Sequence, residues 1–215
     1  AKTLSRVSRV SEPETAEVAN FGAIVFFSDL PLNGSLRASA DYFDFTIIDE
    51  IKTVSHNGIL NTVFVANPGT NNPINCSAPL IDRITFINGQ GAAGCTQGTT
   101  TGNDVTSIRS VRGNGPGANT SGIDYDITYS FEALGGDMSA SVTATNVLAY
   151  EIDAFVLNGT PLTPAVDGLG FANYSRDGDI VSEWRGNASL NYSAGNHNLR
   201  YVMRYIQGVT DDRFI

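Results

Sequence analysis

A strict two-residue alternation of apolar and polar side chains runs through much of this chain and constrains its fold more than any other feature. The alternation is clearest after residue 124, where Tyr125, Ile127 and Tyr129 alternate with polar neighbours. The same pattern recurs in the segments 36–42, 139–145, 187–192 and 199–205. Side chains of a β-strand point alternately to the two faces of a sheet, so each segment is expected to be a strand with one apolar face. Helical periodicity is nearly absent, and an all-β, antiparallel protein is therefore predicted.

The connections between the alternating segments are of two sizes, which are expected at opposite ends of the sheet. Short connections with the residues of hairpin turns join neighbouring segments at 29–34, 132–137 and 193–197. Long connections separate the hairpins, at about 54–106 and about 157–181. We expect one short helix in the first of these loops, at 79–86. The predicted fold is an antiparallel meander of long strands with long loops at one end.

Two architectures share this arrangement of turns: a transmembrane β-barrel, and a soluble sandwich or barrel with binding loops at one pole. The segment 136–155 contains no proline and is longer than the roughly five to six residues of an ordinary strand. The polar residues of the alternating segments are mainly Ser, Thr, Asn, Asp and Arg, whereas Lys2 and Lys52 are the chain's two lysines. A water-filled barrel lumen accounts for such a face, although secreted β proteins also show it. These features favour the membrane barrel.

The composition argues against several other classes of protein. The 13 basic residues are outnumbered by 22 acidic ones and form no cluster, so nucleic acid is not expected as a partner. No apolar run approaches the roughly 18 residues of a transmembrane helix. The chain opens with Ala1-Lys2-Thr3 and without a signal-peptide pattern, so we expect it to be mature, processed or a piece of a longer protein.

Three segments, in this order along the chain, resemble TonB-dependent outer-membrane receptors. The first is the alternating run from Leu36 to Phe45, and the second is Asn114-Gly115-Pro116 followed by residues 120–124. The third begins at Trp184, passes through the turn at 193–197 and ends at Asp211-Asp212, and it resembles the late barrel strands of that family. In order and spacing, the resemblance covers nearly all of the chain after about Glu12.

The resemblance implies a segment of a barrel of roughly 22 strands whose lumen holds an N-terminal plug. Such receptors take up a scarce ligand, such as a siderophore or a saccharide, across the outer membrane of a Gram-negative bacterium with energy relayed by TonB. The implied partners are the remaining strands and the plug, outer-membrane lipid, and TonB through regions outside this chain. The chain departs from the family pattern because it has neither a plug nor a TonB box, and only about six to eight strands are expected. Residues 1–215 are thus predicted to be one partial barrel domain, without catalytic activity or a cofactor.

Two other functions are left open by the residues. One is an extracellular, non-catalytic β protein whose copies assemble edge to edge, because a sheet that does not close leaves unpaired edge strands. The other is a carbohydrate-binding or hydrolytic β domain, which needs clustered carboxylates, such as Asp124 and Asp126, beside aromatic platforms.

The two cysteines, Cys76 and Cys95, flank the predicted short helix in the longest loop. An even pair of cysteines in a loop of an exported protein predicts a disulfide. A zinc site is not expected, because no CxxC spacing occurs and the nearest histidine, His56, lies beyond a Gly/Pro-rich stretch.

On the barrel hypothesis, charged and aromatic residues of the strands take different places. Six charged residues are predicted to line the lumen: Arg37, Asp41, Asp124, Asp126, Arg200 and Arg204. Five tyrosines are predicted to lie at the membrane interfaces: Tyr42, Tyr125, Tyr129, Tyr201 and Tyr205. His56 and His197 are expected to be solvated, and neither 177–179 nor 211–212 has the full ligand series of a calcium loop. No metal site is predicted.

Overall fold

A computed structural model describes residues 12–66, 68–110, 112–176 and 178–214. The chain divides into two compact units, each of which is described by itself. The first, the sheet unit, comprises residues 16–47, 118–152 and the part of the chain from 166 onward. The second, the insert unit, comprises residues 48–117 and 153–165 together with the residues that precede 16.

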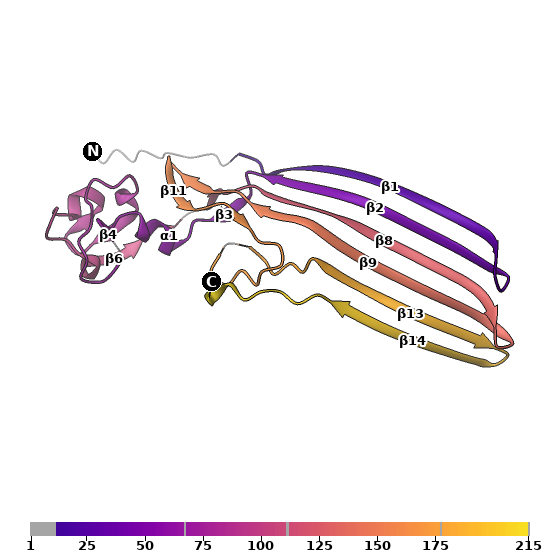
Figure 1. The fold of residues 1–215 in the computed structure, drawn as a ribbon. Helices are drawn as coiled ribbons and strands as arrows, with labels where there is room; N and C mark the ends of the chain where they lie inside the picture. Colours follow the sequence, from indigo (N-terminus) through magenta and orange to yellow (C-terminus); the bar gives the residue numbers. More distant parts are fainter. Residues whose placement is uncertain (1–11, 67, 111, 177, 215) are drawn as a thin grey trace. The chain divides into compact units, whose positions relative to one another are not determined.

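The sheet unit is an antiparallel meander of six long strands, which confirms the predicted fold class (Figure 1). The spatial order of the six strands is their order along the chain, and a short strand, β12 (Val166–Asp167), pairs with β9. The long strands are β1 (Thr15–Leu30), β2 (Gly34–Ile48), β8 (Ala118–Ala133), β9 (Gly136–Ile152), β13 (Trp184–Ala194) and β14 (His197–Ile206). The shortest of them has 10 residues and the longest has 17.

Three tight turns connect these strands in pairs and lie at the same end of the sheet (Figure 1). Leu134 and Gly135, between β8 and β9, have φ values of 55° and 73°, the signature of a type I′ turn. Between β13 and β14, Gly195 with φ 56° occupies the first central position, as a type II′ turn requires. Both turn types match the twist of the strands they join, so the turn residues fix the register of the hairpins.

The insert unit shows that most of the predicted long loop 54–106 is folded around a core of its own. Its elements are β3 (Ile51–Thr53), α1 (His56–Asn61), η1 (Ile81–Arg83), β4 (Ile84–Phe86), β5 (Gly89–Gln90), η2 (Gly91–Gly94), η3 (Gly102–Asp104), β6 (Val105–Ile108), β7 (Arg112–Asn114), β10 (Phe155–Leu157) and β11 (Thr160–Thr163). The strands form three small sheets, β5-β4-β6, β3-β7 and β10-β11. The core includes Ile59, Ile74, Leu80 and Ile84, all of which are buried.

The helix expected at 79–86 is replaced by a shorter turn and a strand. A 3₁₀ turn covers Ile81–Arg83, and the chain continues as β4, which pairs with β6. The extended backbone places Ile84 and Phe86 on one side of β4, and both side chains are buried in the core. Burial of these two alternate residues by the neighbouring strand therefore outweighs the weak helical signal of so short a segment.

The last element is η4 (Asp212–Phe214), a 3₁₀ turn. Among the described residues, no helix is both long enough and apolar enough to cross a membrane.

Candidate functional site

The register of the sheet places all six charged residues predicted for a lumen on one face, here called the polar face. Asp41 pairs with Asp124, and Asp124 pairs on its other side with Thr145. Partners across the remaining strands follow in the same register: Ser39 with Asp126, Arg37 with Thr128, Asn187 with Arg204 and Asn191 with Arg200. Since directly paired residues project to the same side of a sheet, these side chains share one face from β2 to β14.

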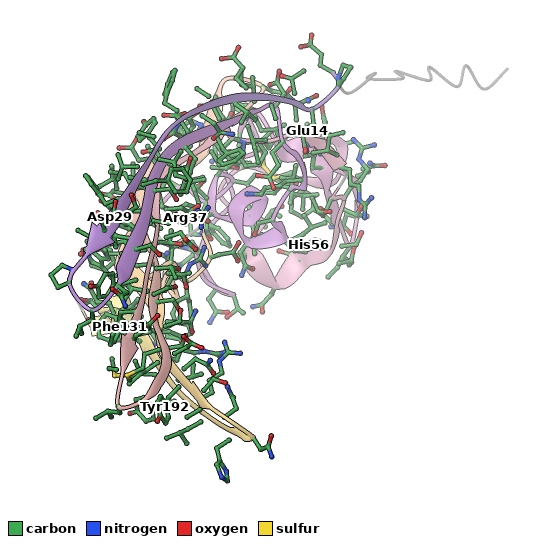
Figure 2. All side chains as sticks on the ribbon, turned by 90° about the vertical axis from the view of Figure 1, so that its right-hand side faces the viewer. Glu14, Asp29, Arg37, His56, Phe131 and Tyr192 are labelled. Carbon is green, nitrogen blue, oxygen red and sulfur yellow. A yellow bond between two sulfur atoms is a disulfide. The ribbon has the colours of Figure 1, made fainter. Side chains whose placement is uncertain are left out.

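The five predicted interface tyrosines share the opposite face, here called the apolar face. Their cross-strand partners are Tyr42 with Ile123, Tyr129 with Leu36, Tyr125 with Ala40, Tyr201 with Leu190 and Tyr205 with Gly186. Tyr125 stacks on Trp184 with ring centroids 6.1 Å apart, and Tyr129 stacks on Phe131 at 5.0 Å. Figure 2, in which Arg37 and Phe131 are labelled, shows side chains standing on both sides of the ribbon.

The apolar face is not covered by any described part of the sheet unit. Ile127, Val142 and Met203 are 40%, 45% and 54% exposed. Among the described residues, the buried apolar cluster belongs to the insert unit, and no side chain of the apolar face contributes to it. A contiguous apolar surface of this extent on a single chain marks a protein or membrane interaction site.

The polar face is held by short hydrogen bonds between side chains of neighbouring strands. Arg37 forms an ion pair with Asp126 at 2.8 Å, and the Thr145 hydroxyl donates to Asp124 at 2.6 Å. Ser141 and Ser189 bond at 2.7 Å. Because the ion pair is exposed, its contribution to stability is about 0–1 kcal/mol. The face is thus hydrophilic and hydrogen-bonded, but it is open to water.

A hollow of about 890 Å³ lies on the polar face, toward the end of the sheet that is opposite the tight turns. Two glycines shape its floor. Gly122 pairs with Phe43, and a Cβ at Gly122 would lie 2.6 Å from the Phe43 ring, so the edge of this ring lies over β8. A Cβ at Gly22 would likewise meet the Asp41 carboxylate, which lies over β1. The missing side chains therefore let an aromatic ring and a carboxylate lie close to the sheet.

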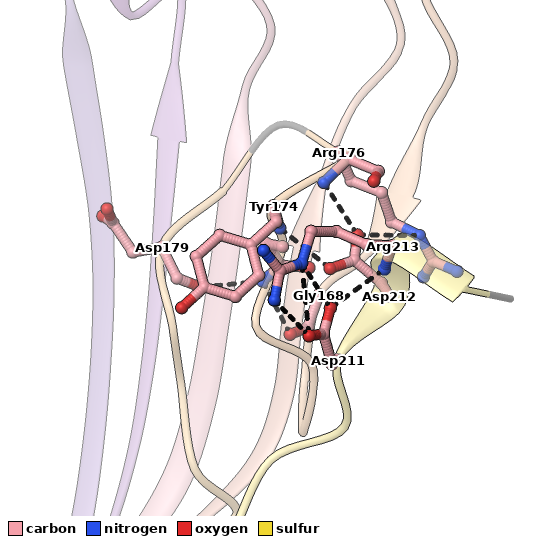
Figure 3. Close-up of polar contacts among 9 residues, drawn as sticks. Gly168, Tyr174, Arg176, Asp179, Asp211, Asp212 and Arg213 are labelled. Atoms are coloured by element: carbon pink, nitrogen blue, oxygen red, sulfur yellow. Dashed lines mark hydrogen bonds and ion pairs between the residues drawn. The ribbon is translucent and has the colours of Figure 1, made fainter.

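One wall of the hollow comes from the segment between β12 and β13, through Ile180, Val181 and Ser182. This segment is fixed to the sheet unit by side-chain hydrogen bonds (Figure 3). The buried Asn173 amide donates to the carbonyls of Gly168, at 3.0 Å, and Asp179, at 2.7 Å. The Asp179 amide donates to the Tyr150 hydroxyl of β9 at 2.9 Å.

Asp212, which lies beyond the last long strand, also binds this segment (Figure 3). Its carboxylate accepts hydrogen bonds from the amides of Tyr174, at 2.8 Å, and Ser175, at 3.0 Å. Burial raises the pKa of Asp212, but the backbone donors Ser175 and Tyr174 and the nearby Arg176 outweigh burial, so the net pKa is lowered. The side-chain hydrogen bond from Arg213 lowers the pKa of Asp211 as well.

The acidic pair near the end of the chain thus has protein partners instead of the ligand geometry of a calcium loop. Asp211 binds the Arg213 guanidinium at 2.6 Å, and Asp212 binds backbone amides. Of the other acidic run, Asp177 lies outside the described residues. Over the described part of the chain, no three His, Cys, Asp or Glu side chains are grouped as a metal ion would need. His56 and His197 are both exposed.

The predicted disulfide is confirmed. Cys76 and Cys95 are bonded, with Cα atoms 5.6 Å apart, and the bond closes a loop across a sequence separation of 19. Cys95 packs against the core of the insert unit. The bond therefore ties η2 to the core in a unit whose sheets have only two or three strands each.

No protein-family model, curated protein or solved structure matches this chain.

Proposed function

We propose that the sheet unit is part of the wall of an outer-membrane β-barrel of the TonB-dependent receptor kind, which takes up a scarce ligand. One observation supports this proposal most strongly: six long antiparallel strands carry an uncovered apolar face opposite a hydrogen-bonded polar face. In a barrel wall the apolar face meets lipid and the polar face meets the aqueous lumen. Most of the residues that resemble this receptor family lie on β2, β8, β13 and β14.

The lengths of the strands agree with the proposal. A strand tilted by about 45° needs roughly 9–11 residues to cross the hydrocarbon core of a membrane. The shortest of the six long strands has 10 residues, so each of them is long enough. The longer strands, up to 17 residues, would extend beyond the bilayer and carry the chain toward its long connections.

The connections assign an orientation within this proposal. Barrels of this kind have short periplasmic turns and longer extracellular loops. The turns at Leu134-Gly135 and Gly195 would therefore face the periplasm, and the insert unit would be extracellular. An oxidising environment outside the cell suits the disulfide of the insert unit.

A second candidate is a secreted, non-catalytic β protein whose copies pair edge to edge. It is favoured by the position of β1 and β14 at the two ends of the strand order. Phe21 and Phe26 on β1 are exposed, and an exposed, apolar edge strand is a template for pairing with another chain. In this function both sheet faces would be in contact with water or with other copies instead of lipid.

Membrane extraction separates the two candidates. The protein, expressed from its complete reading frame, is expected to sediment with the outer membrane and to need detergent for extraction. Without boiling it should migrate faster on a denaturing gel than after boiling, because a closed barrel resists the detergent. A protein that stays in the aqueous fraction and runs as a ladder of polymers would contradict the barrel and support edge-to-edge assembly.

A further inference from the structure

The hollow on the polar face combines aromatic rings with charged hydrogen-bonding groups, and this combination points to a class of ligand. Phe43 and Phe45 lie side by side with ring centroids 5.7 Å apart and a tilt of 47°. Asp41, Asp124 and Arg185 reach the same hollow from β2, β8 and β13. We infer that the hollow binds a neutral oligosaccharide, an inference that rests on the proposed role in ligand uptake.

The two phenylalanine rings give the hollow an apolar surface. The edge of the Phe43 ring lies over Gly122, and Phe45 is 40% exposed. One face of a pyranose ring presents several C–H groups together, and such a face packs on an aromatic ring. A ligand that was polar on every side would leave these rings without a partner. A wholly apolar ligand would exclude the water that solvates the neighbouring carboxylates without replacing its hydrogen bonds, which is unfavourable.

The polar groups of the hollow select hydroxyl groups. A carboxylate accepts hydrogen bonds and a guanidinium donates them. Asp41 and Asp124 can therefore accept from the hydrogens of sugar hydroxyls, and Arg185 can donate to their oxygens. The Thr145 hydroxyl already donates to Asp124, which leaves further lone pairs on this carboxylate for a ligand. Two carboxylates against one guanidinium also give the hollow an excess of negative charge, which disfavours an anionic ligand such as a ferric catecholate siderophore.

The volume of the hollow and its wall are suited to a ligand of more than one sugar ring. About 890 Å³ lies near the upper end of the range for small-molecule sites, roughly 300–1,000 Å³. One wall of the hollow is formed by Ile180, Val181 and Ser182. The hydrogen bonds of Asn173 and Asp212 hold the segment that contains these residues. This fixed wall reduces the ordering that a bound ligand would have to impose.

The test uses the protein from its complete reading frame, folded in detergent, and titrated calorimetrically with three neutral hexasaccharides. The three are the α-1,4-linked and β-1,4-linked glucose hexamers and the β-1,4-linked xylose hexamer. We expect at least one of them to bind. Phe43→Ala and Asp124→Ala should each weaken that binding by about tenfold or more, which is the loss of one good contact.

Two matched variants serve as controls. Phe131→Ala removes an aromatic ring from the other face of the sheet, and Asp126→Ala removes a carboxylate that is two residues from Asp124 and bonded to Arg37. Both should bind the hexasaccharide as the parent does. Heat-modifiable gel migration reports whether each variant is folded, and Phe45→Ala replaces Phe43→Ala if the latter fails to fold.

The outcomes distinguish this inference from the proposed function. A parent protein that shows no heat-modifiable migration would contradict the barrel itself. A folded, heat-modifiable parent that binds none of the three hexasaccharides overturns the saccharide site and leaves the barrel standing. Equal weakening by Phe131→Ala and Phe43→Ala would also overturn it, because the site would then not be on the polar face.

Discussion

The turn between β8 and β9 illustrates how single residues fix the hairpins at the cost of local strain. Leu134 has φ 55°, in the left-handed region that is disfavoured for residues with a Cβ atom, and its side chain is 85% exposed. Its side chain thus contributes little packing that could compensate. The Tyr192 hydroxyl donates to the Leu134 carbonyl at 2.9 Å, a contact that depends on the backbone and not on the leucine side chain.

Leu134→Asn is therefore expected to stabilise the folded protein. Asparagine tolerates the left-handed conformation and is preferred with glycine in type I′ turns, so the gain should be about 1 kcal/mol. The shift of the urea midpoint of unfolding measures it, at unchanged slope. Gly135→Ala is the matched control and should destabilise the same turn, since Gly135 has φ 73°. A lower midpoint for Leu134→Asn would contradict the assignment of the turn.

Asp212 makes the segment beside the hollow sensitive to pH. The folded-state pKa of Asp212 is lowered, so its stabilising hydrogen bonds are fully present above the unfolded value of about 3.9. They are lost as the pH falls further, through the folded-state pKa, because protonation removes the charge that the Tyr174 and Ser175 amides bind. Hydrogen-exchange protection factors of these two amides should therefore decrease at acidic pH.

Asp212→Asn is the control for this pH effect. The amide cannot ionise, so the protection factors of Tyr174 and Ser175 should be low at neutral pH and nearly independent of pH. If the variant lost protection on acidification as steeply as the parent, another group would be responsible and the role of Asp212 would be wrong.

At the scale of the elements, the sequence predicted what depends on periodicity and could not predict what depends on distant contacts. Alternation over ten or more residues fixed which side chains share a face, and the register confirms it for Asp124 and Tyr125. The fold of the insert unit was not predictable, because its core joins Val54 to Phe155 and its strands have two to four residues, too few to show a period. The helix expected at 79–86 failed for the same reason.

The hollow and its wall were also beyond sequence reasoning. Asp212 bonds to amides 37 and 38 positions earlier in the chain, and no local pattern signals such a contact. Gly122 and Phe43 meet only because β2 and β8 are adjacent, although they are separated by the whole first long connection. A glycine inside a strand often marks a close approach of another group, and Gly22 and Gly122 lie inside β1 and β8.

The disulfide belongs to the insert unit and should stabilise that unit specifically. Closing a loop of this length is worth roughly 3 kcal/mol in the chain-entropy model. The double substitution Cys76→Ser/Cys95→Ser should increase the rate of amide hydrogen exchange at residues of the insert unit, such as Leu80 and Ile84. It should also make this unit more susceptible to protease. The variant protein should keep its heat-modifiable gel migration, because this migration depends on the sheet unit. Simultaneous loss of both would show that the two units unfold together and would contradict an independent core in the insert unit.

At the scale of the whole molecule, a barrel wall requires that the two faces of one sheet meet two different solvents, lipid and water. Neighbouring residues of β9 lie on opposite faces: Val142 and Ala144 on the apolar face, and Thr143 and Thr145 on the polar face. If the apolar face meets lipid, then molecules that dissolve in lipid and molecules that dissolve in water should reach alternate residues of this strand. Edge-to-edge assembly of a secreted protein predicts no such division.

Nitroxide labels on single cysteines at these four positions distinguish a barrel wall from a sheet that is in water on both faces. The protein is expressed from its complete reading frame, reconstituted in lipid vesicles, and kept oxidised at Cys76–Cys95. For a barrel wall we expect a two-residue alternation. Collisions with dissolved oxygen should be strongest for labels at Val142 and Ala144, and collisions with a water-soluble nickel chelate should be strongest for labels at Thr143 and Thr145. Equal access of the nickel chelate to all four labels would contradict the barrel wall.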